Sequence, residues 1–225
     1  MKQFIDKVVI ITGGAHGIGK ASAIKFAEEG ASVAIVDRDS QDGEKVAEEI
    51  RESGGVALFF YADVSISADV QKVVGSVAAS FKRIDVLYNN ASVYMAEDGA
   101  VTDIDEDVWD NTMAINLRSV FLFSKYTIPH MLKVGGGAII NTSSSCGIIG
   151  IPNCDAYSAS KGATAEITRS MAVEYGPMNI RVNCIAPAAI MTPMLRLSNL
   201  NSTTFDEERF LKLRSPLRRY GKPEE

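Results

Sequence analysis

The chain has 225 residues, of which 46% are hydrophobic and 23% are charged, a balance typical of a globular protein with a substantial core. Its net charge of −5 argues against nucleic acid as the main partner, because phosphate binding needs a basic surface. No apolar run approaches the roughly 20 residues of a membrane span and no signal peptide precedes the first strand, so neither membrane insertion nor secretion is expected.

Strand and helix patterns alternate from residue 7 to residue 187. Continuous apolar runs predict buried strands at 7–14, 31–37, 56–64, 84–91, 135–145 and 179–187. Helices are predicted between them at 18–30, 40–55, 67–81, 106–131 and 156–175, with Ser40 as an N-cap and Pro129 near the end of the fourth helix. This alternation predicts a Rossmann-type doubly wound parallel sheet of class α/β, with three layers (α/β/α) in a single domain over residues 1–225.

The pattern breaks after Pro187, where residues 188–225 are mixed in character with weak helical signals. We expect a mobile lid over about 188–213 and the start of another helix. The three cysteines form no CxxC pair and are odd in number, which predicts reduced thiols and a cytoplasmic location. With only two histidines, no metal site is expected.

A glycine-rich stretch, TGGAHGIG, lies between the first strand and the first helix. Its glycines Gly13, Gly17 and Gly19 allow the backbone to approach a pyrophosphate, and the following helix N-terminus offers N–H donors. Parallel sheets bind ligands at the carboxyl ends of their strands, which is where this stretch lies. A plain tight turn is the alternative, but the position after the first buried strand favours nucleotide binding.

Carboxylates end the second and third strands. Asp37 lies 18 residues after Gly19, near the spacing at which an acidic residue binds an adenosine ribose. A carboxylate there repels a 2′-phosphate, so NAD is favoured over NADP, although Arg38 and His16 are nearby cations. Asp63 could reach the adenine or act only as a cap.

The stretch AYSASK places Tyr157 and Lys161 four residues apart, on the same face of a helix. Such a pair is common on exposed helix faces. Alternatively, the lysine favours the phenolate and lets the tyrosine exchange a proton with a substrate, since a free tyrosine has a pKa of about 10.

Several motifs in fixed order resemble the short-chain dehydrogenase/reductase family over nearly the whole chain. They are TGGAHGIG, NNAS (89–92), Asn116, SSS (143–145), YSASK and IAPAAIMTP. The resemblance implies Tyr157 as general acid/base, Lys161 as its partner and holder of the nicotinamide ribose, and Ser144, 13 positions before the tyrosine, as hydrogen-bond donor to the substrate oxygen. It also implies that a water held by the Asn116 backbone resupplies the proton.

The implied reaction is reversible hydride transfer between NAD and a secondary alcohol or ketone, with no metal. The resemblance and the strand-end positions together give one set of expected cofactor contacts: Gly13, His16, Gly17, Ile18, Gly19, Asp37, Arg38, Asp63, Val64, Asn90, Lys161, Pro187, Ile190 and Thr192.

Two other functions remain open from the sequence. One is a catalytically silent NAD-binding sensor or scaffold, against which the intact Ser144, Tyr157 and Lys161 argue. The other is a sugar-nucleotide epimerase or dehydratase, which shares the Tyr-x-x-x-Lys pair but usually has another glycine spacing and a larger substrate domain, for which 225 residues leave no room. The resemblance further implies a homodimer or homotetramer, consistent with the apolar stripe of Val120, Phe121 and Phe123, although this stripe could instead pack internally.

The sequence departs from the family pattern at three places. Ser92 and Ala188 stand where the family usually has glycine, and a Cβ there restricts the backbone. The C-terminal helix and seventh strand of the family are not among the 225 residues: either the sequence is truncated or the final strand is absent, and truncation is favoured because the sixth strand would otherwise be an uncovered edge. The expected substrate pocket is mostly apolar: Ser92, Val93, Tyr94, Met95, Cys146, Ile148, Ile149, Asn153, Cys154 and Met194.

Overall fold

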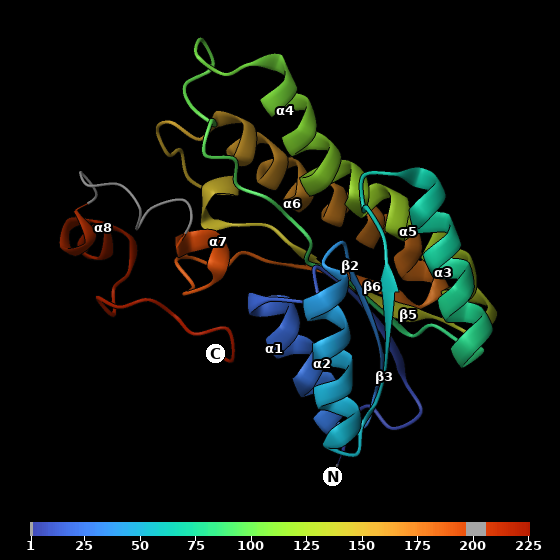
Figure 1. The fold of residues 1–225 in the computed structure, drawn as a ribbon. Helices are drawn as coiled ribbons and strands as arrows, with labels where there is room; N and C mark the ends of the chain where they lie inside the picture. The colour runs from blue at the N-terminus through green and yellow to red at the C-terminus, as the bar shows by residue number, and fades with distance from the viewer. Residues whose placement is uncertain (1, 197–205) are drawn as a thin grey trace.

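The computed structural model describes residues 2–196 and 206–225, and it contains one six-stranded parallel sheet (Figure 1). The strands lie in the order β3-β2-β1-β4-β5-β6. Their bounds are β1 Val8–Thr12, β2 Ser32–Asp37, β3 Val56–Tyr61, β4 Val86–Asn89, β5 Gly137–Thr142 and β6 Ile180–Ile185. Because the order reverses between β1 and β4, the carboxyl ends of these two strands form the crevice where such sheets bind ligands.

The helices fill most of the intervals that the sequence predicts. They are α1 Gly17–Glu28, α2 Ser40–Glu52, α3 Ser67–Phe81, α4 Glu106–Met113, α5 Ser119–Lys133, α6 Asp155–Tyr175, α7 Pro193–Leu195 and α8 Glu207–Arg214. Among the described residues, no helix is both long and apolar enough to cross a bilayer.

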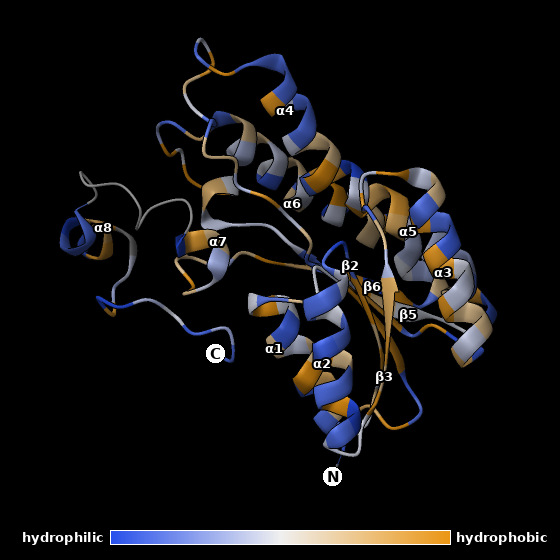
Figure 2. Cartoon of the chain, viewed as in Figure 1, coloured by the Kyte–Doolittle hydropathy of each residue, from blue (hydrophilic) through white to orange (hydrophobic). Residues whose placement is uncertain are grey.

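Two hydrophobic clusters lie on opposite faces of the sheet. Alternate residues of β1 point to opposite faces, so Val9 and Ile11 pack with α1 and α2 while Val8 and Ile10 face α3, α5 and α6. The strands are mostly apolar, whereas the helices carry polar residues on their outward faces (Figure 2). The doubly wound, three-layer prediction is therefore confirmed.

Two local predictions need correction. The N-cap of α2 is Asp39, whose carboxylate accepts a hydrogen bond from the Asp42 N–H at 3.0 Å, so Ser40 is the first residue of the helix and not its cap. The stretch predicted as one long helix over 106–131 is interrupted by a π-helical turn over Ala114–Arg118, and it continues through Pro129 to Lys133.

The C-terminal part of the described chain lies beside the segment that follows β6. Ile190 and Gly221 form an isolated parallel bridge, which is reinforced by hydrogen bonds from Met191 N to Gly221 O and from Gly221 N to Ala189 O. The expected lid falls partly here, with α7 and most of α8, while its residues 197–205 lie outside the described residues. Within the described chain, β6 pairs only with β5 and forms one edge of the sheet.

Candidate active site

The glycine-rich turn leaves bare backbone at the start of α1. Gly13 and Gly17 have φ values of +65° and +50°, which side-chain-bearing residues rarely adopt. A Cβ on Gly19 would lie 1.9 Å from the Gly13 carbonyl oxygen. His16 is the N-cap of α1 but makes no side-chain capping hydrogen bond, so the first N–H groups of the helix remain available to an anion. These features fit the pyrophosphate of a dinucleotide.

Thr12 and Asn90 join the glycine-rich turn to the end of β4. The Thr12 hydroxyl accepts hydrogen bonds from the N–H groups of Asn90 and Ala91, both at 3.0 Å. The Asn90 amide donates to the carbonyl oxygens of Thr12 and Gly13 at 3.1 and 3.2 Å. Asn90, an expected cofactor contact, therefore fixes the shape of the turn directly.

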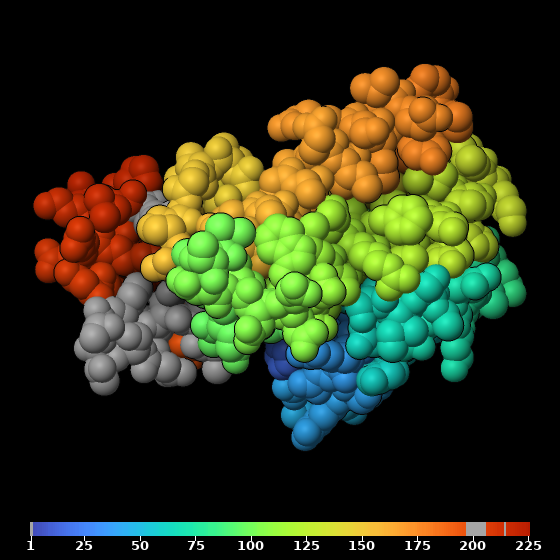
Figure 3. Space-filling view, turned by 90° about the horizontal axis from the view of Figure 1, so that it is seen from above, coloured from blue at the N-terminus to red at the C-terminus, as the bar shows by residue number. Residues whose placement is uncertain are grey.

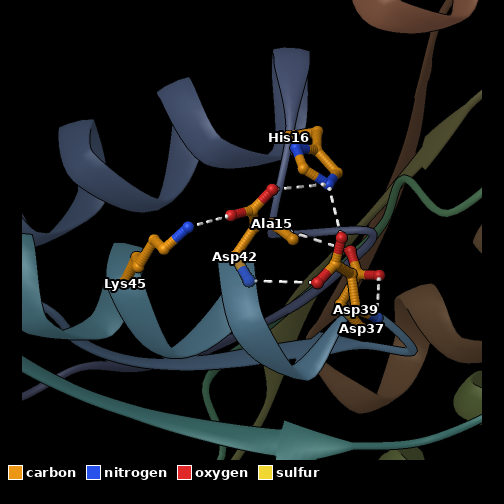
Figure 4. Close-up of polar contacts among 6 residues, drawn as sticks. All are labelled: Ala15, His16, Asp37, Asp39, Asp42 and Lys45. Carbon is orange, nitrogen blue, oxygen red and sulfur yellow. Dashed lines mark hydrogen bonds and ion pairs between the residues drawn. The ribbon is translucent and has the colours of Figure 1, made fainter.

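Asp37 lies at the end of β2, beneath the glycine-rich turn (Figure 4). Its two carboxylate oxygens accept hydrogen bonds from Ala15 N at 3.0 Å and Asp39 N at 3.1 Å. Each oxygen keeps a further lone pair with which it can accept a bond from a ribose hydroxyl. Arg38, next to it, is exposed.

A charged group lies above Asp37. His16 Nε2 approaches carboxylate oxygens of Asp39 and Asp42 at 3.2 and 3.6 Å, and Lys45 pairs with Asp42 at 2.8 Å. The possible ligand atoms of His16, Asp39 and Asp42 lie within 4.8 Å of one another, a convergence that sequence reasoning did not find. The pKa of Asp39 is lowered by hydrogen bonds from the Asp42 N–H and from His16. The His16 ring, which the sequence offers as a nearby cation, thus faces the carboxylates of Asp39 and Asp42.

Asp63 forms a turn after β3 through its side chain. Its carboxylate accepts hydrogen bonds from the N–H and the hydroxyl of Ser65 at 2.8 and 2.6 Å, and Val64 beside it is buried. These contacts describe a turn after β3.

Tyr157 and Lys161 lie on the first two turns of α6, and the lysine is not on an exposed face. Lys161 is 1% exposed, and its ammonium group donates to the carbonyl oxygen of Thr142 at 2.8 Å. Its Nζ lies 5.6 Å from the centroid of the Tyr157 ring. The ring of Tyr94 packs edge-on against the Tyr157 ring, with centroids 5.3 Å apart. The exposed-face alternative for this pair is therefore wrong.

Burial controls the protonation of both groups. It raises the pKa of Tyr157, as do the nearby Cys146 and Cys154 thiols, while a hydrogen bond with the Ser144 hydroxyl lowers it. Burial lowers the pKa of Lys161 to about 8. The protein by itself thus favours a protonated phenol, in contrast to the acidification that the sequence predicts from the lysine.

The three consecutive serines differ in their contacts. The Ser143 hydroxyl is buried and donates to the Lys161 carbonyl oxygen at 2.7 Å, so it anchors α6. The Ser144 hydroxyl accepts from Cys146 N at 3.2 Å and is in contact with Tyr157. Ser144 is therefore the serine whose hydroxyl meets the tyrosine.

Asn116 lies in the π-helical turn and is 1% exposed. Its side-chain amide forms a matched pair with the backbone of Val93, accepting from N at 2.8 Å and donating to O at 2.9 Å, and also donates to Ser160 Oγ at 3.1 Å. Because a π-helical turn shifts the usual i to i−4 pairing, the backbone carbonyl of Asn116 faces α6, where Thr164 Oγ1 lies 3.5 Å away.

Asp98, in the loop between β4 and α4, contacts the start of α6 and was missed by sequence reasoning. Its carboxylate oxygens accept hydrogen bonds from Ala156 N at 3.1 Å and Tyr157 N at 2.8 Å. Cys154, the N-cap of α6, forms no side-chain cap bond, so Asp98 supplies the cap from a distant part of the chain. Asp155 reciprocates by accepting from Val101 N at 2.9 Å.

These residues surround a cavity of about 440 Å³ at the carboxyl ends of β1, β4 and β5. Figure 3 shows the segments that include 91–105 (green) and 145–155 (yellow) at the end of the molecule that carries α8 (red). The predicted site residues that line the cavity are Gly13, His16, Ile18, Asn90, Ser144, Tyr157, Pro187, Ile190 and Thr192. Lys161 and Asn116 lie buried behind it, and those outside its lining are Gly17, Gly19, Asp37, Arg38, Asp63 and Val64.

The expected substrate pocket is partly realised. Ser92, Tyr94, Cys146, Cys154 and Met194 line the cavity, whereas Val93, Met95, Ile148, Ile149 and Asn153 do not. The side chains of Ile148 and Ile149 are instead exposed, at 71% and 54%. Neither Ser92 nor Ala188 has a positive φ, so both departures from glycine are accommodated without backbone strain.

Comparisons with known proteins agree with this geometry. The family model described as short chain dehydrogenase matches residues 7–202. An uncharacterized oxidoreductase of Thermotoga maritima is 41% identical over 99% of this chain and 88% of its own length, and a cyclopentanol dehydrogenase of Comamonas sp. is 41% identical over 86% of this chain and 77% of its own.

The crystal structure of a levodione reductase superposes with a TM-score of 0.94 at 37% identity, covering 99% of this chain and 88% of that one. The family match, the relatives and the shared fold lead to one conclusion. The chain belongs to the short-chain dehydrogenase family, and it is an oxidoreductase that acts on CH–OH groups with a nicotinamide cofactor.

Proposed function

We propose that the protein is an NAD-dependent dehydrogenase that interconverts secondary alcohols and ketones, with Tyr157 as the general acid/base. The observation that carries the proposal is that Tyr157 and Ser144 line the same cavity as the glycine-rich turn. A bound dinucleotide would supply or accept the hydride, and the residues of the chain would bind, orient and exchange the proton.

In this proposal Ser144, Tyr157, Lys161 and Asn116 each have a separate task. The Ser144 hydroxyl donates a hydrogen bond to the substrate oxygen, where negative charge develops. The Tyr157 hydroxyl gives its proton to a ketone oxygen or takes one from an alcohol. Lys161 holds the nicotinamide ribose and, when charged, favours the phenolate. The Asn116 backbone carbonyl holds a water that reconnects Lys161 to solvent.

The preference for NAD over NADP rests on Asp37. Its carboxylate is held by Ala15 N and Asp39 N at the end of β2, so its negative charge cannot easily turn away from a 2′-phosphate. The neighbouring Asp39 and Asp42 carboxylates add negative charge on the same side and engage His16. A ribose with free hydroxyls suits this environment better than a phosphorylated one.

The proposed substrate is an uncharged alcohol or ketone of modest size, with a ring as the best fit. Among the residues that the structure describes, no Asp, Glu, Lys or Arg lines the cavity. Tyr94, Met194 and Phe210 provide flat or apolar surface instead. The cyclopentanol dehydrogenase relative is named for a cyclic alcohol, which favours the same class.

The proposal extends to the organisation of the protein. We assign one catalytic domain to residues 1–225 and a lid to about 188–213, because Pro193, Met194, Leu195 and Phe210 from this segment line the cavity. A cytoplasmic location agrees with the three free cysteines.

A homo-oligomer, dimer or tetramer, is proposed through the surface formed by α4, the π-helical turn, α5 and α6. Of the three apolar residues in the expected stripe, Val120 and Phe123 are buried inside the protomer, and only Phe121, at 46% exposure, remains for an interface. It lines a mostly apolar surface hollow with Met113, Leu117 and Ile167.

The test is an absorbance assay of NADH formation over a panel of cyclic and linear secondary alcohols, with Tyr157→Phe as the test variant. We expect turnover to fall by about 10²-fold or more in this variant, with NAD affinity by fluorescence titration unchanged. Tyr126→Phe is the matched control, because its hydroxyl pairs with Ser67 Oγ at 2.9 Å on the outer helices, and it keeps full activity. Comparable turnover in Tyr157→Phe and the native protein would contradict the assignment.

A further inference from the structure

Two of the three free cysteines meet at the wall of the cavity. Cys146 lies in the short 3₁₀ turn Ser145–Gly147 after β5, and Cys154 is the N-cap residue of α6. Both line the cavity, the turn that carries Cys146 packs against α6, and the Cys146 thiol contributes to the raised pKa of Cys154. The third, Cys184, is on β6, outside the cavity lining. None of the proposed catalytic steps uses these thiols.

The two thiols differ in accessibility. Cys154 is 2% exposed, and its sulfur donates to the Ile151 carbonyl oxygen at 3.4 Å and lies 3.3 Å from Ser158 Oγ. Cys146 is half-buried and faces the cavity, where a small solute can reach it. Burial raises the pKa of the Cys154 thiol, which keeps it protonated near neutral pH. The pair therefore consists of one accessible thiol and one protected thiol held beside it.

We propose that Cys146 and Cys154 form a redox-sensitive pair that hydroperoxides convert reversibly into a disulfide. The Cys146 thiolate attacks the peroxide O–O bond, forming an S–O bond and releasing hydroxide or alkoxide, so that Cys146 becomes a sulfenic acid. The Cys154 sulfur then displaces water from this sulfenic acid as the S–S bond forms. In total, two thiols lose two electrons and two protons, and the peroxide is reduced to two hydroxyl-containing products.

The disulfide would act on the catalytic groups through their neighbours, and this consequence rests on the proposed function. Ser144 accepts a hydrogen bond from the Cys146 N–H, and Tyr157 lies on the first turn of α6, three residues after Cys154 at the N-cap position. An S–S bond is about 2.05 Å long, shorter than any contact between two thiols. Its formation would therefore draw the turn Ser145–Gly147 and the start of α6 toward each other. Displacement on the scale of 1 Å lowers rates by up to about 10²-fold.

The experiment treats the full chain with hydrogen peroxide at low molar excess and follows two readouts. The first is mass spectrometry after alkylation of free thiols and digestion without reduction. Cys146 and Cys154 share the tryptic peptide 134–161, because no Lys or Arg lies between them, while Cys184 falls on a separate peptide. We expect the shared peptide to lose two hydrogen atoms and resist alkylation, while the Cys184 peptide is alkylated in full.

The second readout is turnover, with each variant normalised to its own untreated activity. We expect about 10- to 100-fold inactivation that dithiothreitol reverses in the native protein and in Cys184→Ser. Cys146→Ser and Cys154→Ala should form no disulfide; the smaller alanine guards against poor folding of a buried serine.

Sulfinic acid at Cys146 without the disulfide, or full alkylation of both thiols after treatment, would overturn the proposal. Because the mass readout needs no turnover, a disulfide in a protein that is inactive on all alcohols would count against the proposed function only.

Discussion

Lys161 combines complete burial with a pKa near 8, which gives it a measurable effect on stability. The folded protein releases this proton at lower pH than the unfolded chain, whose lysine keeps the usual value of 10.5. Between these two values the unfolded state binds more protons, so stability rises as pH increases. The gain from this residue amounts to about 3 kcal/mol. We expect the free energy of unfolding, measured with denaturant between pH 7.5 and about 10, to rise with pH in the native protein and to rise less in Lys161→Met. Equal pH slopes in the two proteins would contradict this role of Lys161.

Asp37 is the residue on which cofactor choice is expected to depend. Asp37→Asn should raise the NADP-to-NAD ratio of kcat/KM by about tenfold or more, because the neutral amide no longer repels a phosphate. Steady-state kinetics with both cofactors measures the ratio. Asp42→Asn is the matched control, since it removes a nearby carboxylate that faces the side chains of His16 and Lys45, whereas Asp37 accepts a hydrogen bond from the backbone N–H of Ala15 in the glycine-rich turn. A similar change in both variants would mean that the general charge of this surface, and not Asp37, sets the preference.

At the scale of elements, the start of α6 depends on the loop that precedes α4. Asp98→Ala removes the acceptor for two N–H groups, one of them on Tyr157. We expect a loss of about 1 kcal/mol in unfolding free energy, together with about a tenfold fall in kcat and an unchanged KM for NAD, because the tyrosine shifts while the glycine-rich turn does not. Asp103→Ala, an exposed carboxylate in the same loop, is the control. Rescue of kcat in Asp98→Asn, which retains one acceptor oxygen, would support positioning; a parallel fall in NAD affinity would argue against it.

The elements themselves could be predicted from the sequence because nearly every strand is an apolar run and the runs alternate with helical patterns. The glycine-rich turn, Asp37 and the Tyr157–Lys161 pair could be found for the same reason, since their spacing is local. The role of Asp98 could not, because it acts on a residue 59 positions away. The π-helical turn at Asn116 is equally invisible to periodicity. The raised pKa of Tyr157 follows from burial, which no local pattern reports.

At the scale of the whole molecule, Asp85 links the two halves of the sheet where β1 and β4 begin. This carboxylate, 6% exposed, accepts hydrogen bonds from Val8 N, Lys7 and Arg83. Burial alone would raise its pKa, but these donors hold the pKa below the ordinary value.

The stability from Asp85 is therefore present above about pH 4 and is lost as pH falls through its lowered pKa. Asp85→Asn should lower the unfolding free energy by about 2 kcal/mol at pH 7 and by less near pH 3. Thermal or urea unfolding at both pH values measures the difference, and a pH-independent loss would contradict the role of the charge.

The seam between β1 and β4, held by the Thr12 hydroxyl and the Asn90 amide, divides two tasks along the chain. The residues proposed to select NAD over NADP lie before the end of β4 in the chain, and the residues proposed to contact the alcohol lie after it. If the part of the chain after β4 is exchanged for that of a relative, the substrate specificity should therefore change to that of the relative. The coenzyme preference should stay the same, provided that these few hydrogen bonds are kept. Because the two specificities lie in separate segments of the chain, recombination of these segments would let a new substrate specificity arise without a change in coenzyme preference.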